Sequence, residues 1–285
     1  MNLRIHAICL LLALAGLRGV AAEATWSRDI EFGNAGGESL RLDASVPPGD
    51  GPFPIAILIH GGGWGNGDKA QDFVALAKPL TDAGFTWFSV NYRLAPKHRW
   101  PACFEDVQAA IRWVRANAAT YKGDPRRIAL IGYSAGGQLA TLAAIRADAT
   151  TRVQAVVGLA PAVELVADSK RRGEVSPALR NLLGLPEMLD DEALAEIAAI
   201  SPAGEVKPGL PPFLIAQGTA DQSVRHIDAL AFIARLRQAD VPCALLEMKD
   251  APHRIGEWPK FSPEYPAKVA AWLKTTLASN PPESP

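Results

Sequence analysis

Three side chains in this sequence could together activate a hydroxyl group as a nucleophile: those of Ser134, Asp221 and His253. Ser134 is the centre of the pentapeptide Gly-Tyr-Ser-Ala-Gly. An apolar run at 127–131 precedes it and predicts a strand, and a stretch of small residues at 137–144 follows it and predicts a helix. A turn this sharp accepts only small residues two places before and after the serine, and it lifts the hydroxyl clear of the backbone. Such a hydroxyl can attack a carbonyl carbon. The alternative is a glycine-rich turn whose serine is incidental.

A serine nucleophile needs a base within hydrogen-bonding distance, and the base needs an acid that orients it. If the chain order is serine, acid, histidine, the base follows Ser134, and His226 and His253 are the candidates. We predict His253, because it lies in a loop after the apolar run at 243–248. Loops that follow the strands of a doubly wound sheet are where its catalytic and binding residues lie. His226 stands at the start of a helical pattern and is expected on the surface.

Asp221 is the predicted acid, because it lies in the loop that follows the apolar run at 212–217. There it could accept a hydrogen bond from the histidine ring and fix its tautomer. The competing role is that of a helix cap. The alternative acids are Asp228 inside a predicted helix, Glu247 inside a predicted strand, and Asp250, which is very close to the histidine in sequence.

A run of three glycines, Gly61 to Gly63, follows His60 at the end of a predicted buried strand. Glycines at this place let the backbone N–H groups face a ligand. The amides of Gly62, Gly63 and Ala135 could therefore form an oxyanion hole. Phosphate binding is the competing use of such a loop, but neither of the common glycine-rich phosphate-binding patterns fits here. His60 itself is predicted to hold the loop by hydrogen bonds.

The elements that must position these residues are strands and helices that alternate along the chain. This alternation predicts one α/β domain over residues 23–279, with a mostly parallel, doubly wound sheet of about eight strands. The predicted strands are 26–32, 39–46, 55–59, 85–90, 127–132, 153–159, 212–217 and 243–248. The first two are expected to pair antiparallel. An amphipathic helix is predicted at 101–119, and a turn at Asp124-Pro125.

Residues 161–209 interrupt this alternation, because they are polar and contain several prolines. They are predicted to form a short, partial cap over an open cleft, with one helical segment near 191–199. The proline-rich tail at 280–285 is predicted to be disordered.

The composition is that of a soluble globular protein, with 29 Lys and Arg, 30 Asp and Glu, and a formal net charge of −1 over 285 residues. It contains no basic stripe that would favour a nucleic-acid partner. Residues 1–22 are predicted to be a secretory signal peptide, because Arg4 precedes an apolar core and small residues end it at Ala22. This predicts an exported protein, periplasmic or extracellular. No other segment approaches the ~20 apolar residues that a membrane span requires.

Cys103 and Cys243 are the cysteines that follow the predicted signal peptide. They are expected to be buried free thiols, because two cysteines do not make a disulfide framework. No cysteine and histidine cluster has the spacing of metal ligands, so no metal site is predicted.

Together the motifs resemble those of the α/β-hydrolase superfamily. The resemblance rests on HGGGW at 60–64, NYRLAP at 91–96 and GYSAGG at 132–137, in that order, and it covers about residues 38–278. These motifs are similar to the esterase branch, which includes hormone-sensitive-lipase-like carboxylesterases and exported bacterial acetyl and feruloyl esterases that act on plant polysaccharides. Tyr133 stands where the hormone-sensitive-lipase-like enzymes usually carry Asp, and few residues precede the first strands. Both features favour the exported polysaccharide-esterase type.

The resemblance implies a serine esterase of the α/β-hydrolase fold that needs no cofactor. The residues that match its catalytic triad are Ser134, Asp221 and His253. Those that match its oxyanion amides are Gly62, Gly63 and Ala135. Those that match its substrate pocket are Trp64, Tyr133 and Trp258. The implied substrate is a small ester or an acylated oligosaccharide, with acetyl or feruloyl groups on plant cell-wall carbohydrate. A general short-chain carboxylesterase and an arylformamidase are alternatives, and a non-catalytic binding module on the same fold is a remote one.

Overall fold

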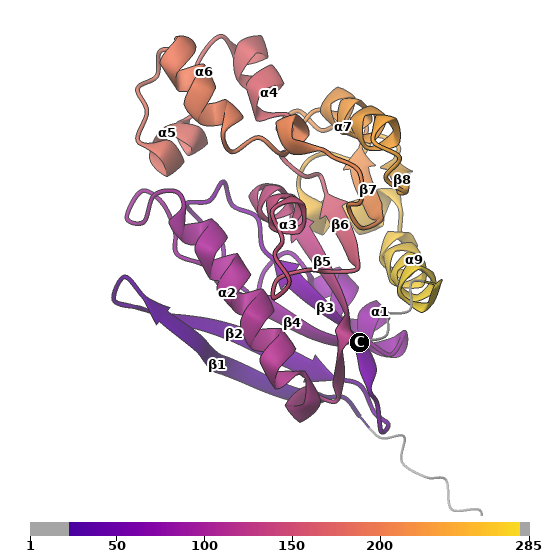
Figure 1. Cartoon of the computed structure of the whole chain (residues 1–285). Coiled ribbons are helices and arrows are strands. Elements are labelled where there is room, and N and C mark those ends of the chain that lie inside the picture. The colour runs from indigo at the N-terminus through magenta and orange to yellow at the C-terminus, as the bar shows by residue number, and fades with distance from the viewer. Residues whose placement is uncertain (1–22, 280–285) are drawn as a thin grey trace, which may run out of the picture.

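The computed structural model describes residues 23–279, and the predicted signal peptide (1–22) and tail (280–285) lie outside the described residues. One sheet of eight strands runs through the molecule in the order β1-β2-β4-β3-β5-β6-β7-β8 (Figure 1). The strands are β1 (Thr25–Ala35), β2 (Glu38–Val46), β3 (Phe53–Ile59), β4 (Thr86–Val90), β5 (Gly123–Tyr133), β6 (Ala155–Leu159), β7 (Phe213–Gly218) and β8 (Cys243–Met248). Each strand overlaps its predicted range.

The sheet is parallel except at one edge. The pairs β1–β2 and β2–β4 are antiparallel, and all other neighbouring strands are parallel. Every residue of β4 and of β6 is buried, as expected for strands that are covered on both faces. Parallel neighbours need crossover connections, and most of these connections contain helices. The predicted α/β fold with a mostly parallel sheet is confirmed.

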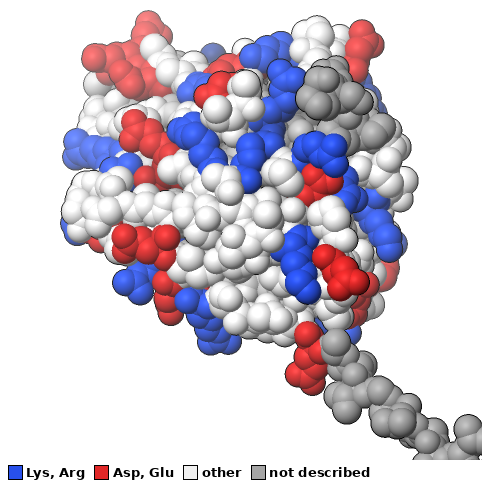
Figure 2. Space-filling view, turned by 60° about the horizontal axis from the view of Figure 1, so that its bottom comes forward, with Lys and Arg blue, Asp and Glu red and all other residues white. Residues whose placement is uncertain are grey.

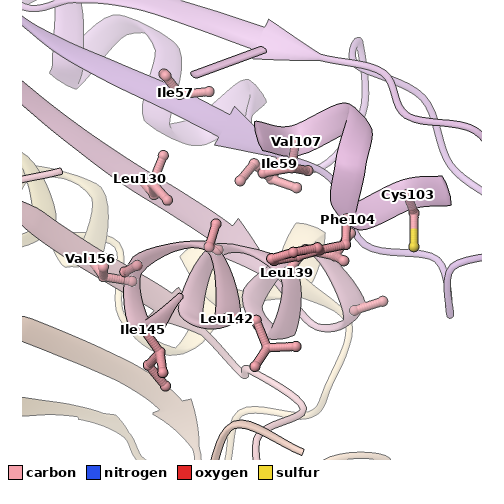
Figure 3. Close-up of a cluster of buried hydrophobic side chains, with 14 of the residues drawn as sticks. Ile57, Ile59, Cys103, Phe104, Val107, Leu130, Leu139, Leu142, Ile145 and Val156 are labelled. Atoms are coloured by element: carbon pink, nitrogen blue, oxygen red, sulfur yellow. The ribbon is translucent and has the colours of Figure 1, made fainter. Parts of the chain in front are cut away.

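Helices pack against both faces of the sheet through two clusters of buried apolar side chains. The helices are α1 (Val74–Asp82), α2 (Ala102–Asn117), α3 (Ala135–Ile145), α7 (His226–Gln238) and α9 (Tyr265–Ser279). One cluster joins α2, α3 and α7 to the sheet, and Figure 3 shows Val107 of α2 and Leu139 of α3 in it, with Leu130 of β5. The other cluster joins α1 and α9 to the opposite face. Successive residues of a strand point to opposite faces of the sheet, so the same strands contribute side chains to both clusters.

The insertion between β6 and β7 contains three α-helices, where the sequence predicts one helical segment. They are α4 (Leu165–Arg172), α5 (Pro177–Leu183) and α6 (Asp191–Ala198), and a short 3₁₀-helix, η2 (Pro202–Glu205), follows them. Figure 1 shows the three helices together at one end of the molecule. The prediction missed α4 (LVADSKRR) and α5 (PALRNLL) because they lack the run of strong helix formers that α6 has (DEALAEIA), although Ser176 caps α5 and Pro177 starts it.

Two further expectations differ in detail from the structure. Asp124 and Pro125 lie inside β5 rather than in a turn before it, next to an irregularity in the pairing with β3. Cys103 and Cys243 are both free thiols, but only Cys103 is fully buried.

Basic and acidic side chains are interspersed on the face drawn in Figure 2. Over residues 23–279, no helix combines the length and the apolar character that crossing a membrane would need.

A buried ion pair fixes the segment after β4. The guanidinium of Arg93 donates to both carboxylate oxygens of Asp106 on α2, at 2.8 to 3.0 Å, and the Arg93 backbone amide donates to the same carboxylate at 2.8 Å. Asp106 is only 2% exposed. The hydrogen bond to this carboxylate raises the pKa of Arg93. The 91–96 segment is therefore tied to α2 by charge-assisted hydrogen bonds.

Replacing Asp106 with Ala should lower the free energy of unfolding by about 3 kcal/mol or more, because it leaves a largely buried guanidinium without its partner. Glu105→Ala is the matched control. Its carboxylate pairs with the same arginine, but its side chain is 60% exposed, so that change should cost within about 0.5 kcal/mol. Urea unfolding of both variants gives the comparison. Equal losses would show that the buried pair does not stabilise the segment.

Candidate active site

Ser134 occupies a strained turn between β5 and α3. Its backbone has φ 53° and ψ −116°, a combination that costs a non-glycine residue on the order of 1–3 kcal/mol. The flanking glycines make the turn possible. A Cβ atom on Gly132 would lie 2.2 Å from the carbonyl oxygen of Gly136, and one on Gly136 would lie 2.1 Å from that of Ile59. The expectation that only small residues fit on either side therefore has a steric cause.

The structure brings together the three residues that the sequence predicts as a triad. Ser134 Oγ lies 3.0 Å from His253 Nε2, and His253 Nδ1 lies 2.7 Å from Asp221 Oδ2. The Asp221 side chain is fully buried, whereas that of His253 is 22% exposed. Since a carboxylate accepts, Nδ1 is the donating nitrogen and Nε2 is left to accept the serine hydroxyl proton.

Asp221 is held by three more hydrogen bonds. Its Oδ1 accepts from the backbone amides of Ser223 and Val224 at 2.8 and 2.9 Å, and its Oδ2 accepts from Gln217 Nε2 at 3.1 Å. These donors fix the position of the carboxylate. Sequence reasoning missed Gln217. The available signal was a polar residue in an otherwise apolar strand, four positions before the acid.

The alternative acids and the alternative base lie elsewhere. Asp228 on α7 is paired with Arg171 at 2.6 Å, and burial raises the pKa of this carboxyl. Glu247 lies 2.7 Å from His226 Nε2, so these two alternatives meet each other instead of Ser134. The side chain of Asp250 is exposed. Among the predicted candidates, only Asp221 contacts the histidine that reaches Ser134.

Two predicted substrate-pocket residues support the His253 loop. Tyr133 donates its hydroxyl to the His253 carbonyl at 2.8 Å, and the two rings stack with centroids 5.3 Å apart. Trp258, at the start of the short helix α8 (Trp258–Phe261), donates its indole N–H to the Pro252 carbonyl at 2.8 Å. Trp258 is fully buried, so its position differs from the predicted one on the pocket wall.

The glycine loop after β3 presents free amides to the serine. Gly62 and Gly63 have φ values of 108° and 58°, which favour glycine. Within residues 23–279, neither of their amides donates to a protein acceptor. The Ala135 amide opens α3, and N–H groups of a first helical turn have no partner within the helix. The three predicted oxyanion amides are thus available to a ligand.

Buried side chains hold this loop. His60 donates Nδ1–H to the Gly61 carbonyl at 2.7 Å, and its ring stacks on Tyr92 with centroids 4.2 Å apart. Tyr92 donates its hydroxyl to the His60 carbonyl at 3.0 Å, and Asp72 accepts the Gly61 amide at 2.8 Å. Burial lowers the pKa of His60, which keeps the ring neutral. His60 therefore has the structural role that the sequence predicts.

Gln138 links the loop to the cap. This fully buried side chain on α3 accepts the indole N–H of Trp64 at 3.0 Å and donates to the Ile200 carbonyl at 2.8 Å. Trp64 is 4% exposed and has a positive φ of 58°. It contributes a wall of the cleft, but most of its ring lies in the core.

Ser134 and His253 border two hollows of different character. The first, called the apolar hollow, has a volume of about 340 Å³ and is lined mainly by Trp64, Ala135, Ala162, Val163, Leu165, Pro177, Ala178, Leu179 and Val224, with a few charged side chains of the cap and α7. The second, called the polar hollow, has a volume of about 440 Å³ and is lined by Gly61, Gly62, Gly63, Asn66, Gly67, Gln71, Asp72, Tyr133 and Ser223. The serine hydroxyl thus stands between an apolar and a polar compartment.

The region around Ser134 holds no candidate metal site. Over residues 23–279, no three His, Cys, Asp or Glu side chains are grouped so that they could bind a metal ion. The side chains of Ser134 and His253 can carry out nucleophilic attack and proton transfer, and backbone amides can stabilise an anion.

Comparison with solved structures identifies the same fold in other proteins. A truncated carbohydrate esterase from gut microbiota superposes with a TM-score of 0.78 at 23% identity, over 91% of this chain and 99% of that one. The butyrate-bound esterase Est2 of Thermogutta terrifontis superposes with a TM-score of 0.71 at 24% identity, over 90% and 94%. At these identities the likeness concerns the fold.

Comparison of sequences identifies the family. Esterase LipQ of Mycobacterium tuberculosis is 34% identical over 230 residues, which are 76% of this chain and 54% of that protein. Esterase LipC of the same organism is 33% identical over 207 residues, 65% and 49% respectively. The chain thus spans about half the length of these relatives. The BD-FAE family model matches residues 42–236, and the chain belongs to this family of α/β-hydrolases.

Proposed function

We propose that this chain is a serine esterase that cleaves small carboxylic esters through an acyl-enzyme intermediate. The observation that carries the proposal is the chain of contacts from Ser134 Oγ to His253 and on to Asp221, at 3.0 and 2.7 Å, beside three free amides. The names of the mycobacterial relatives, which are called esterases, support the same reaction class.

The first half of the reaction forms the acyl-enzyme. Ser134 Oγ attacks the ester carbonyl carbon while His253 Nε2 accepts the hydroxyl proton. Asp221 keeps the imidazole in the required tautomer and stabilises the imidazolium that forms. The tetrahedral intermediate then collapses, and His253 returns the proton to the leaving alkoxide, which departs as an alcohol.

The second half releases the acid. Water gives a proton to His253 Nε2 and attacks the acyl carbon, and Ser134 leaves with that proton. In both halves, negative charge develops on the former carbonyl oxygen. The amides of Gly62, Gly63 and Ala135 stabilise that charge, and the N-terminus of α3 adds its dipole. Removing one such donor from a comparable site costs roughly 10²–10³ in turnover.

We extend the proposal to acetyl or feruloyl esters of plant cell-wall carbohydrate as the substrates, met in the periplasm or outside the cell. The division of the cleft supports this extension, because an acyl group suits the apolar hollow and a sugar suits the polar hollow. Rates on acetylated sugars, feruloyl esters and p-nitrophenyl acyl esters test it. Cleavage of the p-nitrophenyl esters alone would favour a general short-chain carboxylesterase, and cleavage of formylated arylamines an arylformamidase.

Replacing Ser134 with Ala should reduce turnover on the order of 10⁶-fold, as in comparable triads, while the fold stays intact. Hydrolysis of p-nitrophenyl acetate and labelling by a fluorophosphonate measure the loss, and circular dichroism checks the fold. A purified variant that keeps more than a few per cent of the activity would contradict the proposed nucleophile.

Asp221→Asn should lower turnover by roughly 10⁴-fold, because the amide favours the wrong tautomer of the His253 ring. Asp250→Asn is the matched control. Its exposed carboxylate lies on the same loop as the histidine, and Asn tolerates its positive φ of 60°. This control should stay close to the parent rate. A larger loss from Asp250→Asn than from Asp221→Asn would mean that the acid is misassigned.

Acetyl and propionyl esters should be cleaved faster than esters with acyl chains of about eight carbons or more. The three cap helices have only seven or eight residues each, so we expect a long acyl chain to extend beyond the cap, where each methylene left in water forfeits ~0.8 kcal/mol. Rates across a series of acyl lengths measure this. A maximum at long chains, or a jump in rate above the micelle concentration of the substrate, would instead indicate a lipase.

A further inference from the structure

A third hollow lies beside the polar hollow and shares one of its walls. It has a volume of about 250 Å³, and its lining includes Trp26, Arg28, Val74 and Trp87. Gln71 lines both this hollow and the polar hollow that Ser134 borders. Gln71, in the loop that runs from the glycine motif to α1, therefore stands at the border of both hollows.

Trp26 gives the third hollow an aromatic surface. This residue of β1 is 50% exposed, whereas most of the large apolar side chains of the protein are buried. Its ring meets Trp87 edge-on, with centroids 4.8 Å apart and an interplanar angle of 83°. Because Trp87 is only 4% exposed, Trp26 rests on a fixed support while part of its ring is open to solvent. A rigid exposed indole is suited to pack against the apolar face of a sugar ring.

Polar groups without protein partners lie between Ser134 and this indole. The side chains of Asn66 and Gln71 are exposed. Within residues 23–279, the side-chain amide of neither residue makes a hydrogen bond to the protein. Each amide offers donors and an acceptor to hydroxyl groups. The nearby ammonium of Lys69 is already paired with Asp29 and Asp43 at 2.9 and 3.0 Å, so it contributes little free charge. The exposed guanidinium of Arg28 also lines the third hollow and can donate hydrogen bonds to hydroxyl groups. This lining therefore suits a hydroxyl-rich ligand better than a lipid.

We propose that the catalytic cleft continues from Ser134 past Asn66 and Gln71 to Trp26 and holds the carbohydrate chain that carries the ester. This inference rests on the proposed esterase function. The acyl group enters the apolar hollow, the esterified sugar occupies the polar hollow, and a neighbouring sugar along the chain stacks on Trp26. The enzyme would then prefer acylated oligosaccharides to acylated monosaccharides.

The test compares long and short substrates in the full chain. Trp26→Ala and Gln71→Ala should each raise KM for acetylated oligosaccharides about tenfold, the effect of losing roughly 1.4 kcal/mol of binding. Trp26→Ala should leave kcat/KM for p-nitrophenyl acetate unchanged, because Trp26 borders neither of the hollows at Ser134. Trp26→Phe keeps an aromatic face and should recover most of the loss. Phe261→Ala is the matched control, because Phe261 is 43% exposed and borders none of the three hollows.

A binding measurement separates this inference from the proposed reaction. Calorimetry with Ser134→Ala should detect unacylated xylo-, manno- or cello-oligosaccharides, and adding Trp26→Ala should abolish that binding. No binding of any of the three classes would overturn the inference, even if p-nitrophenyl acetate is cleaved. Equal losses on long and short substrates, or a loss from Phe261→Ala as large as that from Trp26→Ala, would also overturn it. Failure of the parent enzyme on every ester would overturn the proposed function, and the binding result would still decide the inference.

Discussion

The site depends on the close approach of α3 to the carboxyl ends of β3 and β5. At Gly136 the backbone of the helix comes so near to the end of β3 that a methyl group would lie 2.1 Å from the Ile59 carbonyl oxygen. This approach brings the serine turn beside the glycine loop that continues β3. One steric constraint therefore sets two functional elements next to each other, the hydroxyl and the free amides. The strained backbone of Ser134 is the local cost of that approach.

Buried polar groups around the glycine loop make its shape rigid. The loop is held by Tyr92 and Asp72, and Tyr92 stands beside Arg93, which is paired with Asp106. The NYRLAP segment also reaches the loop directly, since the Ala95 amide donates to the Trp64 carbonyl at 2.9 Å. Amides that are fixed before the substrate arrives need no reorganisation when charge develops, and this is the physical basis of the oxyanion role that we propose for them.

Most of the sheet and the meeting of Ser134, Asp221 and His253 could be predicted from the sequence. Each of the three follows an apolar run, and the carboxyl ends of parallel strands lie at one edge of a sheet. The cap helices α4 and α5 could not be predicted, because residues that favour caps and turns interrupt their helix formers and their burial is decided by tertiary packing. The supporting contact of Tyr133 with the His253 carbonyl joins residues far apart in the sequence, which no local pattern connects.

Gln138 has a mechanical consequence for the cap. Its fully buried amide holds the Trp64 indole on one side and the Ile200 carbonyl on the other. Displacing the end of the cap would leave a buried donor unsatisfied, at a cost of about 1–3 kcal/mol. One side chain thus ties the end of the cap to Trp64, the residue that follows the proposed oxyanion glycines. Movement of the cap away from the cleft therefore carries an energetic cost at a buried amide, in addition to the loss of apolar contacts.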